Sequence, residues 1–167
     1  MSGNIAIGIQ DFSTIIQGNY FYIDKTPFIK EWWDCGDSAT LITRPRRFGK
    51  TLTMSMVEQF FSIDYAGRSD LFEHLAIWKE EKYRELQGTY PVISLSFARI
   101  KERDYEKTKQ KMCEVLRNIY IKFCYIKDSE KLTDADRAYY ERMLEENIKE
   151  TDATSSLYPV SYTHLRA

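Results

Sequence analysis

The chain has 167 residues, of which 43% are hydrophobic and 14% aromatic, a composition that excludes a disordered chain and suits one globular domain with a real core. Its 24 Lys and Arg against 25 Asp and Glu residues leave a formal net charge of -1, so no overall field attracts nucleic acid or a membrane and any basic site must be local. Apolar runs of membrane-spanning length and a secretory signal pattern are absent from the sequence, and the 3 cysteines form no CxxC pair. We therefore expect a cytoplasmic protein without membrane contact, disulfide framework or zinc site.

The first part of the chain predicts a helix and then a strand. Thr26 offers a capping oxygen and Pro27 suits the first helical position, so a helix is expected to start there. The apolar residues of that helix fall on one face, at Phe28, Ile29, Trp32 and Trp33. Residues 35–38 then favour a turn, and Ala39 to Thr43 favour a short buried strand.

The rest of the chain predicts three further helices and a second strand. Apolar residues recur at helical spacing at Leu52, Met56, Phe60 and Ile63. Alternation over residues 91–97 predicts a strand, a long helix is expected from about Tyr105, and Thr133 with Asp136 forms a capping box for the last helix. Alternating strands and helices predict an α/β fold in which helices flank a parallel sheet.

A short basic loop lies between the first predicted strand and the helix that follows it. It ends in Gly49-Lys50-Thr51, as in the phosphate-binding pattern G-x-x-x-x-G-K-[ST], although Arg44 stands in the first glycine position. In that interpretation Gly49 lets the backbone approach phosphate, Lys50 reaches the β and γ phosphates, and Thr51 binds Mg²⁺. The predicted nucleotide-binding residues are Arg46, Arg47, Phe48, Gly49, Lys50, Thr51 and Leu52. The alternative is a basic turn that binds no phosphate.

Several segments together resemble the predicted AAA-ATPase-like family. They are Arg44 to Leu52, preceded by Asp11-Phe12 and Tyr22-Ile23-Asp24-Lys25-Thr26 and followed by Leu71-Phe72 and Tyr90-Pro91-Val92-Ile93. Members are bacterial and archaeal P-loop ATPases that often carry a C-terminal restriction-endonuclease-like nuclease domain, and an arginine in the first glycine position is the family's own variation. The resemblance implies a P-loop NTPase-type parallel sheet, a prokaryotic origin, ATP and Mg²⁺ as cofactors, and nucleic acid as a partner through the nuclease domain. It leaves the role of the segment Tyr22 to Thr26 open.

The catalytic carboxylates implied by this family are not identified in the chain. Hydrolysis requires acidic residues that hold magnesium and polarise water, and in the family they end an apolar strand in Asp-Glu-Tyr-Asp. We expect the fold to be truncated before this acidic (Walker B) strand, so that the chain binds nucleotide and hydrolyses it poorly. Asp24 also ends an apolar run, but it precedes the loop, and a turn or capping role is expected for it.

The last nine residues match no earlier pattern. Pro159 to Ala167 back-translate to CCT GTC TCT TAT ACA CAT CTC CGA GCC, which resembles a transposase mosaic-end adapter used in sequencing libraries. We therefore predict that residues 1–158 are the N-terminal part of an AAA-ATPase-like domain and that residues 159–167 are a non-native tail.

Other functions fit the same residues. The loop could serve a non-catalytic nucleotide- or nucleic-acid-binding module, with Arg46 and Arg47 on phosphate, or these arginines could simply be solvated. Trp32 and Trp33 could stack on a base, although core packing is the simpler role. An incomplete parallel sheet could also leave the chain poorly folded and inactive. The sequence sets neither the nucleotide's identity nor the oligomeric state.

Overall fold

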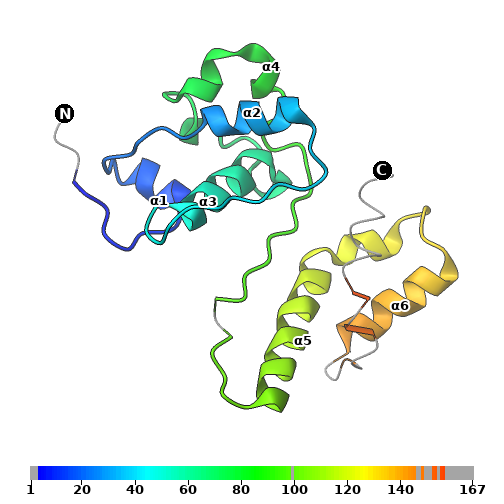
Figure 1. Ribbon diagram of the computed structural model, residues 1–167. Coiled ribbons are helices and arrows are strands. Elements are labelled where there is room, and N and C mark those ends of the chain that lie inside the picture. Colours follow the sequence, from blue (N-terminus) through cyan, green and yellow to red (C-terminus); the bar gives the residue numbers. More distant parts are fainter. Residues whose placement is uncertain (1–3, 99, 146–147, 149–151, 154, 157–167) are drawn as a thin grey trace. The chain divides into compact units, whose positions relative to one another are not determined.

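The chain forms two compact units, Met1–Val92 and Ile93–Ala167 (Figure 1). The computed structural model describes residues 4–98, 100–145, 148, 152–153 and 155–156. The predicted non-native tail, residues 159–167, lies outside the described residues. Each unit has its own set of buried apolar side chains.

The described part of the chain is helical. The first unit contains α1 (Phe12–Gln17), α2 (Pro27–Cys35), α3 (Lys50–Phe61) and α4 (Glu81–Arg84), with 3-10 turns η1 (Ile63–Tyr65), η2 (Ser69–Leu71) and η3 (Ala76–Lys79). The second contains α5 (Tyr105–Lys122), η4 (Cys124–Asp128) and α6 (Asp134–Leu144). The described residues include no β-strand, so the predicted α/β fold with a P-loop NTPase-type parallel sheet is wrong for this structure.

Both predicted strands are irregular segments without sheet partners. Residues 39–43 lack regular secondary structure, and Leu41 is 85% exposed where a buried strand residue was expected. Residues 91–97 are also irregular, and the described residues contain a single parallel bridge, between Ser62 and Tyr90. Alternating apolar residues are compatible with extended backbone, but a strand also needs a neighbour that completes its hydrogen-bond ladder. These segments have no such neighbour in the described chain.

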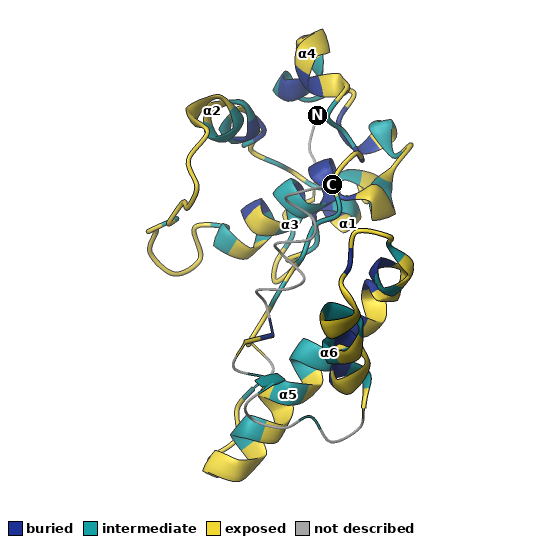
Figure 2. Cartoon of the chain, turned by 90° about the vertical axis from the view of Figure 1, so that its right-hand side faces the viewer, coloured by how far each residue is buried: buried dark blue, intermediate teal, exposed yellow. Residues whose placement is uncertain are grey.

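Aromatic residues form much of the core of the first unit. Figure 2 marks the buried positions of its helices in dark blue. Phe12 of α1 stacks on Phe72 at 5.1 Å between ring centroids, and Phe60 of α3 meets the same ring edge-on at 5.1 Å. The apolar face predicted for α2 is confirmed, because Ile29 is buried and Phe28, Trp32 and Trp33 pack against the same core. The helix predicted after the basic loop is also confirmed, as α3.

Asp24 connects the segment before α2 to η3 through hydrogen bonds. Its carboxylate accepts hydrogen bonds from the Thr26 backbone N–H at 2.8 Å and hydroxyl at 2.7 Å, and from the Ala76 N–H at 2.7 Å. The hydroxyl of Thr26 accepts from the Ile77 N–H at 3.2 Å instead of capping α2, which corrects the expected capping role of Thr26. The turn role expected for Asp24 is confirmed, and these bonds fix the backbone on both sides of Lys25.

The second unit packs α5 and α6 around buried tyrosines. The capping box predicted at the start of α6 is confirmed, because the Asp136 N–H donates to the Thr133 hydroxyl and the Asp136 carboxylate accepts from the Thr133 N–H. Tyr140 of α6 is 2% exposed, and Tyr120 of α5 is fully buried beside it. Ile119, Phe123, Ile126, Leu132 and Met143 complete this core.

Candidate phosphate-binding site

The loop before α3 contains two left-handed residues, separated by Phe48. Arg47 has φ 68°, an uncommon conformation for a residue with a side chain, and Gly49 has φ 73° directly before the first residue of α3. The first hydrogen bond at this end of α3 runs from the Thr53 N–H to the Gly49 carbonyl at 2.8 Å. The N–H groups of Lys50, Thr51 and Leu52 are therefore the ones that a helix start leaves without intrahelical partners. Left-handed positions in a turn beside such N–H groups make an anion-binding concavity.

The backbone conformation of Gly49 favours glycine, and the residue lies against a lysine from another segment. Its positive φ favours glycine, and a Cβ at this position would lie 2.6 Å from the Lys25 Nζ. Phe48 directs its carbonyl to the same ammonium, which donates to it at 3.0 Å. The loop backbone and the Lys25 ammonium are thus in direct contact.

Lys50 contacts the other end of the loop. Its ammonium donates to the carbonyl oxygens of Arg44 and Pro45, the latter at 3.0 Å. An ammonium has three donors and no acceptor, so a carbonyl pair and a phosphate oxygen can share it. The Lys50 ammonium therefore lies at the beginning of the loop, beside Arg44 and Pro45.

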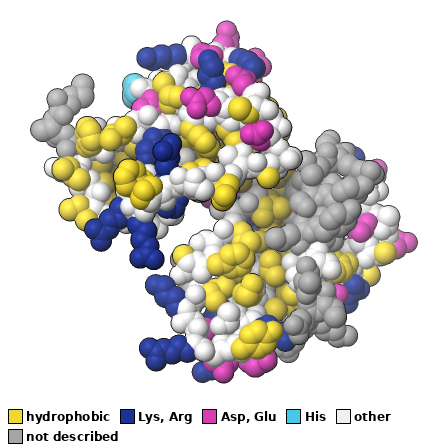
Figure 3. Space-filling model, viewed as in Figure 1, with side chains coloured by type: hydrophobic (Ala, Val, Ile, Leu, Met, Phe, Trp, Pro, Cys, Tyr) yellow, Lys and Arg dark blue, Asp and Glu magenta, His cyan; other side chains and the backbone are white. Residues whose placement is uncertain are grey.

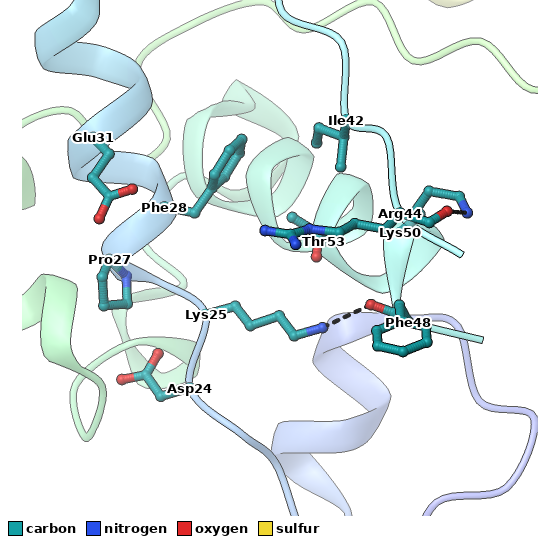
Figure 4. A pocket seen from close by; sticks show the side chains of 10 residues that line it. All are labelled: Asp24, Lys25, Pro27, Phe28, Glu31, Ile42, Arg44, Phe48, Lys50 and Thr53. Carbon is teal, nitrogen blue, oxygen red and sulfur yellow. Dashed lines mark hydrogen bonds between the residues drawn. The ribbon is translucent and has the colours of Figure 1, made fainter. Parts of the chain in front are cut away.

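A cavity of about 440 Å³ opens beside this loop (Figure 4). Its lining comes from the segment before α2, from α2 itself, from the basic loop and from α3, and comprises Asp24, Lys25, Pro27, Phe28, Glu31, Ile42, Arg44, Phe48, Lys50 and Thr53. Figure 4 shows the Arg44 side chain reaching from the loop across the cavity toward α2, and Lys25 reaching toward Phe48 from the opposite wall. The cavity thus joins cationic groups to an apolar side made by Phe28 and Ile42.

The predicted nucleotide-binding residues divide into three groups in the structure. Lys50 and Phe48 line the cavity, with Gly49 between them. The side chains of Arg46, Arg47 and Thr51 are exposed and do not line it, and Leu52 packs against the core of the first unit. On the face drawn in Figure 3, Lys and Arg side chains gather beside exposed hydrophobic ones on the first unit.

Carboxylates are sparse at this site. Asp24 and Glu31 line the cavity, and both carboxylate oxygens of Asp24 already accept hydrogen bonds from Thr26 and Ala76. Within the described ranges, no group of three or more His, Cys, Asp and Glu side chains could hold a metal ion. A hydroxyl such as that of Thr51 is compatible with magnesium that arrives with a nucleotide, since that ion keeps most of its ligands from water and phosphate.

The Tyr22 hydroxyl contacts both the Lys25 backbone and α3. It accepts a hydrogen bond from the Lys25 backbone N–H at 3.3 Å and lies 3.3 Å from the Met56 sulfur of α3. Burial raises the pKa of the Tyr22 hydroxyl to about 12, so it stays a neutral, fixed support at physiological pH.

Sequence reasoning missed part of this lining. Lys25, Phe28, Glu31 and Ile42 were not predicted as site residues, although Lys25 lies in the segment Tyr22 to Thr26 whose role was open. Trp32 and Trp33 pack against Phe61, with ring centroids at 5.6 and 5.4 Å, which confirms core packing for both. The described helices include none that is long and apolar enough to cross a membrane.

Comparison with known proteins supplies the family. The family described as "Predicted AAA-ATPase" matches residues 6–157, nearly the whole chain. The chain is also similar to an uncharacterized protein from the vnfD 5' region of Azotobacter chroococcum mcd 1, with 33% identity over 113 residues. That match covers 67% of this chain and 20% of the relative, so the chain spans about a fifth of the relative's length. No solved structure matches this chain significantly. The chain belongs to the predicted AAA-ATPase family.

Proposed function

We propose that the first unit binds ATP with Mg²⁺ through the loop from Arg46 to Leu52. The observation that supports this most strongly is the pair of left-handed residues, Arg47 and Gly49, immediately before the free N–H groups of α3. Family membership supports nucleotide use in general. The proposal adds ATP, magnesium and the residues that bind them.

The residues present fit such a ligand. Gly49 carries no Cβ, and the Lys25 ammonium lies where that atom would be, so a cation stands directly beside the loop backbone. Lys50 supplies a cation for the β and γ phosphates, and the Thr51 hydroxyl would join the magnesium shell. Arg46, Arg47, Phe48 and Leu52 contribute backbone N–H groups. Bound magnesium would neutralise phosphate charge, as it does in phosphoryl transfer generally.

Hydrolysis is proposed for the parent protein rather than for this chain. Among the described residues the cavity offers only Asp24 and Glu31 as carboxylates, and Asp24 is engaged in holding η3. We therefore propose that ATP binding resides here and that efficient hydrolysis needs an acidic group from outside these residues.

Equilibrium binding of Mg-ATP to the purified chain tests the proposal. Lys50→Ala removes a charged hydrogen-bond donor, worth roughly 1.5–3 kcal/mol, and should weaken binding by about ten- to a hundredfold. Lys79→Ala is the matched control, because Lys79 is an exposed lysine of η3 in the same unit and does not line the cavity. Equal affinity of wild type and Lys50→Ala would contradict nucleotide binding by this loop.

A second candidate is a non-catalytic module that binds nucleic acid through the loop, by itself or beside a nuclease domain of the parent protein. Arg46 and Arg47 favour it, since both are exposed and have no ion-pair partner among the described side chains. Binding of this kind weakens steeply with salt. DNA binding that Arg46→Ala with Arg47→Ala removes, in a protein that binds no Mg-ATP, would select this candidate.

We also propose a cytoplasmic location. Cys35, Cys113 and Cys124 are all free, as expected for a protein kept in a reducing compartment.

A further inference from the structure

We propose that Lys25 is a second phosphate ligand, which together with Lys50 clamps the terminal phosphates of the bound nucleotide. The inference rests on the proposed nucleotide binding and assigns a role to the segment Tyr22 to Thr26. It names a residue 24 positions before Gly49 in the sequence, outside the phosphate-binding pattern itself.

The first observation is the place of the ammonium. The Lys25 Nζ donates to the Phe48 carbonyl at 3.0 Å and lies 2.6 Å from the position that a Cβ of Gly49 would take. Lys50 donates to carbonyl oxygens at the beginning of the same loop. The two ammonium groups therefore bind opposite ends of the loop, and both lysines are among the residues that line the cavity (Figure 4).

The second observation is how firmly Lys25 is held. Its backbone N–H donates to the Tyr22 hydroxyl. The residues on either side, Asp24 and Thr26, accept hydrogen bonds from the Ala76 and Ile77 N–H groups of η3, and these bonds hold the backbone in place. Such anchoring lowers the entropic cost of presenting a long side chain to a ligand, because the backbone is already ordered.

The third observation is that the charge of Lys25 is not neutralised. Two other lysines of the unit are paired with carboxylates, Lys30 with Glu80 at 2.6 Å and Lys82 with Asp34 at 3.0 Å. Lys25 has no ion pair among the described residues. The carboxylate of the neighbouring Asp24 accepts hydrogen bonds from Thr26 and Ala76 and does not bind the Lys25 ammonium. Only one of the three donors of the Lys25 ammonium is used, so two remain for phosphate oxygens.

A positioning role would have different consequences. If Lys25 served only to order the loop through the Phe48 carbonyl, its loss would weaken all nucleotides alike. A direct ligand loses affinity in proportion to the phosphate charge that it contacts, and arginine should replace it in part because charge is kept.

The test measures binding of Mg-ATP, Mg-ADP and AMP to wild type, Lys25→Gln, Lys25→Arg and the control Lys79→Gln. We expect Lys25→Gln to weaken Mg-ATP by about tenfold, Mg-ADP less and AMP hardly at all, in line with a charged hydrogen bond. Lys25→Arg should recover part of the Mg-ATP affinity, and Lys79→Gln should match wild type.

The outcomes separate this inference from the proposed function. Mg-ATP binding that depends on Lys50 but is unchanged in Lys25→Gln overturns the inference alone. An equal loss for ATP, ADP and AMP also overturns it, since that is the mark of loop ordering. Wild-type protein that binds no Mg-ATP overturns both. Unfolding midpoints of all variants, measured in parallel, show that the comparison is made between folded proteins.

Discussion

The two units bury their aromatic residues in different ways. In the first unit phenylalanine rings pack on one another, as Phe12, Phe60 and Phe72 do, and contribute no polar atoms. In the second unit, the buried Tyr140 hydroxyl lies 2.9 Å from the Tyr120 carbonyl and 2.6 Å from that of Phe123. The phenylalanine cluster of the first core is therefore sensitive to lost volume, and the Tyr140 site of the second also to a lost hydrogen-bond donor. In the first core a hydroxyl donor comes from Tyr83, which binds the Asp34 carboxylate at 2.6 Å.

The units also differ in what they offer a ligand. The first has a cationic cavity beside a loop with two left-handed residues. The second has a smaller cavity of about 340 Å³ with both acidic and basic side chains, lined by Glu106, Lys109, Gln110, Cys113, Glu114, Arg117 and Ile148. The family match covers residues of both units, yet the groups suited to phosphate gather in the first. The residues suited to binding phosphate therefore lie in one part of the segment that matches the family, not along all of it.

Phe60→Ala should have the largest effect on this comparison. Phe60 is fully buried between Phe61 and Phe72, and truncation of such a side chain costs about 3–5 kcal/mol. Hydrogen exchange should show lost protection in α1 and α3, with α5 and α6 protected as before because their core is a separate set of side chains. Equal loss in both units would show that their stabilities are coupled.

Tyr140→Phe should affect the second unit by about 1–3 kcal/mol, because it removes the buried hydroxyl that donates to the Tyr120 and Phe123 carbonyl oxygens, of which Phe123 keeps the Ile126 N–H. Tyr105→Phe is the control, since Tyr105 is 69% exposed at the start of α5. Chemical denaturation of both variants measures the difference. If the two substitutions cost the same, the buried hydroxyl has no special role in this core.

Gly49→Ala should cost about 1–2 kcal/mol from its left-handed backbone and also weaken Mg-ATP binding. Gly36→Ala is a matched control, because Gly36 has φ 65° and no atom within 4 Å of an added Cβ, whereas at Gly49 the Lys25 ammonium is in the way. Both variants should lose similar stability, and only Gly49→Ala should lose nucleotide. A similar loss of binding in both would remove the special role of the Gly49 position.

Asp11 should give the smallest effect, a pH dependence confined to the first unit. Burial tends to raise the pKa of its carboxyl, but hydrogen bonds from Ser13, Thr14 and Gln59 together outweigh it and lower the pKa below 3.8. A lowered folded-state pKa means that this stabilisation is present above the unfolded pKa and is lost as pH falls through the folded one. Asp11→Asn should flatten that acid limb in thermal unfolding between about pH 5 and 2. An unchanged acid limb would assign it to other carboxylates.

Local signals predicted the helices well. The helical periodicity after the loop gave α3, and the Thr133 and Asp136 pair gave the start of α6, because both patterns depend on residues within one or two turns. The predicted strands failed for the opposite reason. Alternation over residues 39–43 and 91–97 is local, but a strand exists only when another segment pairs with it, and the described chain supplies no such partner.

The sequence by itself determined the helix starts and the basic loop with its Gly49-Lys50-Thr51, since these depend on neighbouring residues. It also determined the family, through short motifs spread along the chain that need no knowledge of the fold. Only the tertiary structure decided that Arg44 and Lys25 line the same cavity and that the ammonium of a distant lysine lies against Gly49. Lys25 reaches the loop because Asp24 and Thr26 bind backbone groups of η3, about 50 residues away in the chain. Contacts between segments so far apart leave no periodic or spacing signal in either segment. They can therefore be identified only in the folded structure.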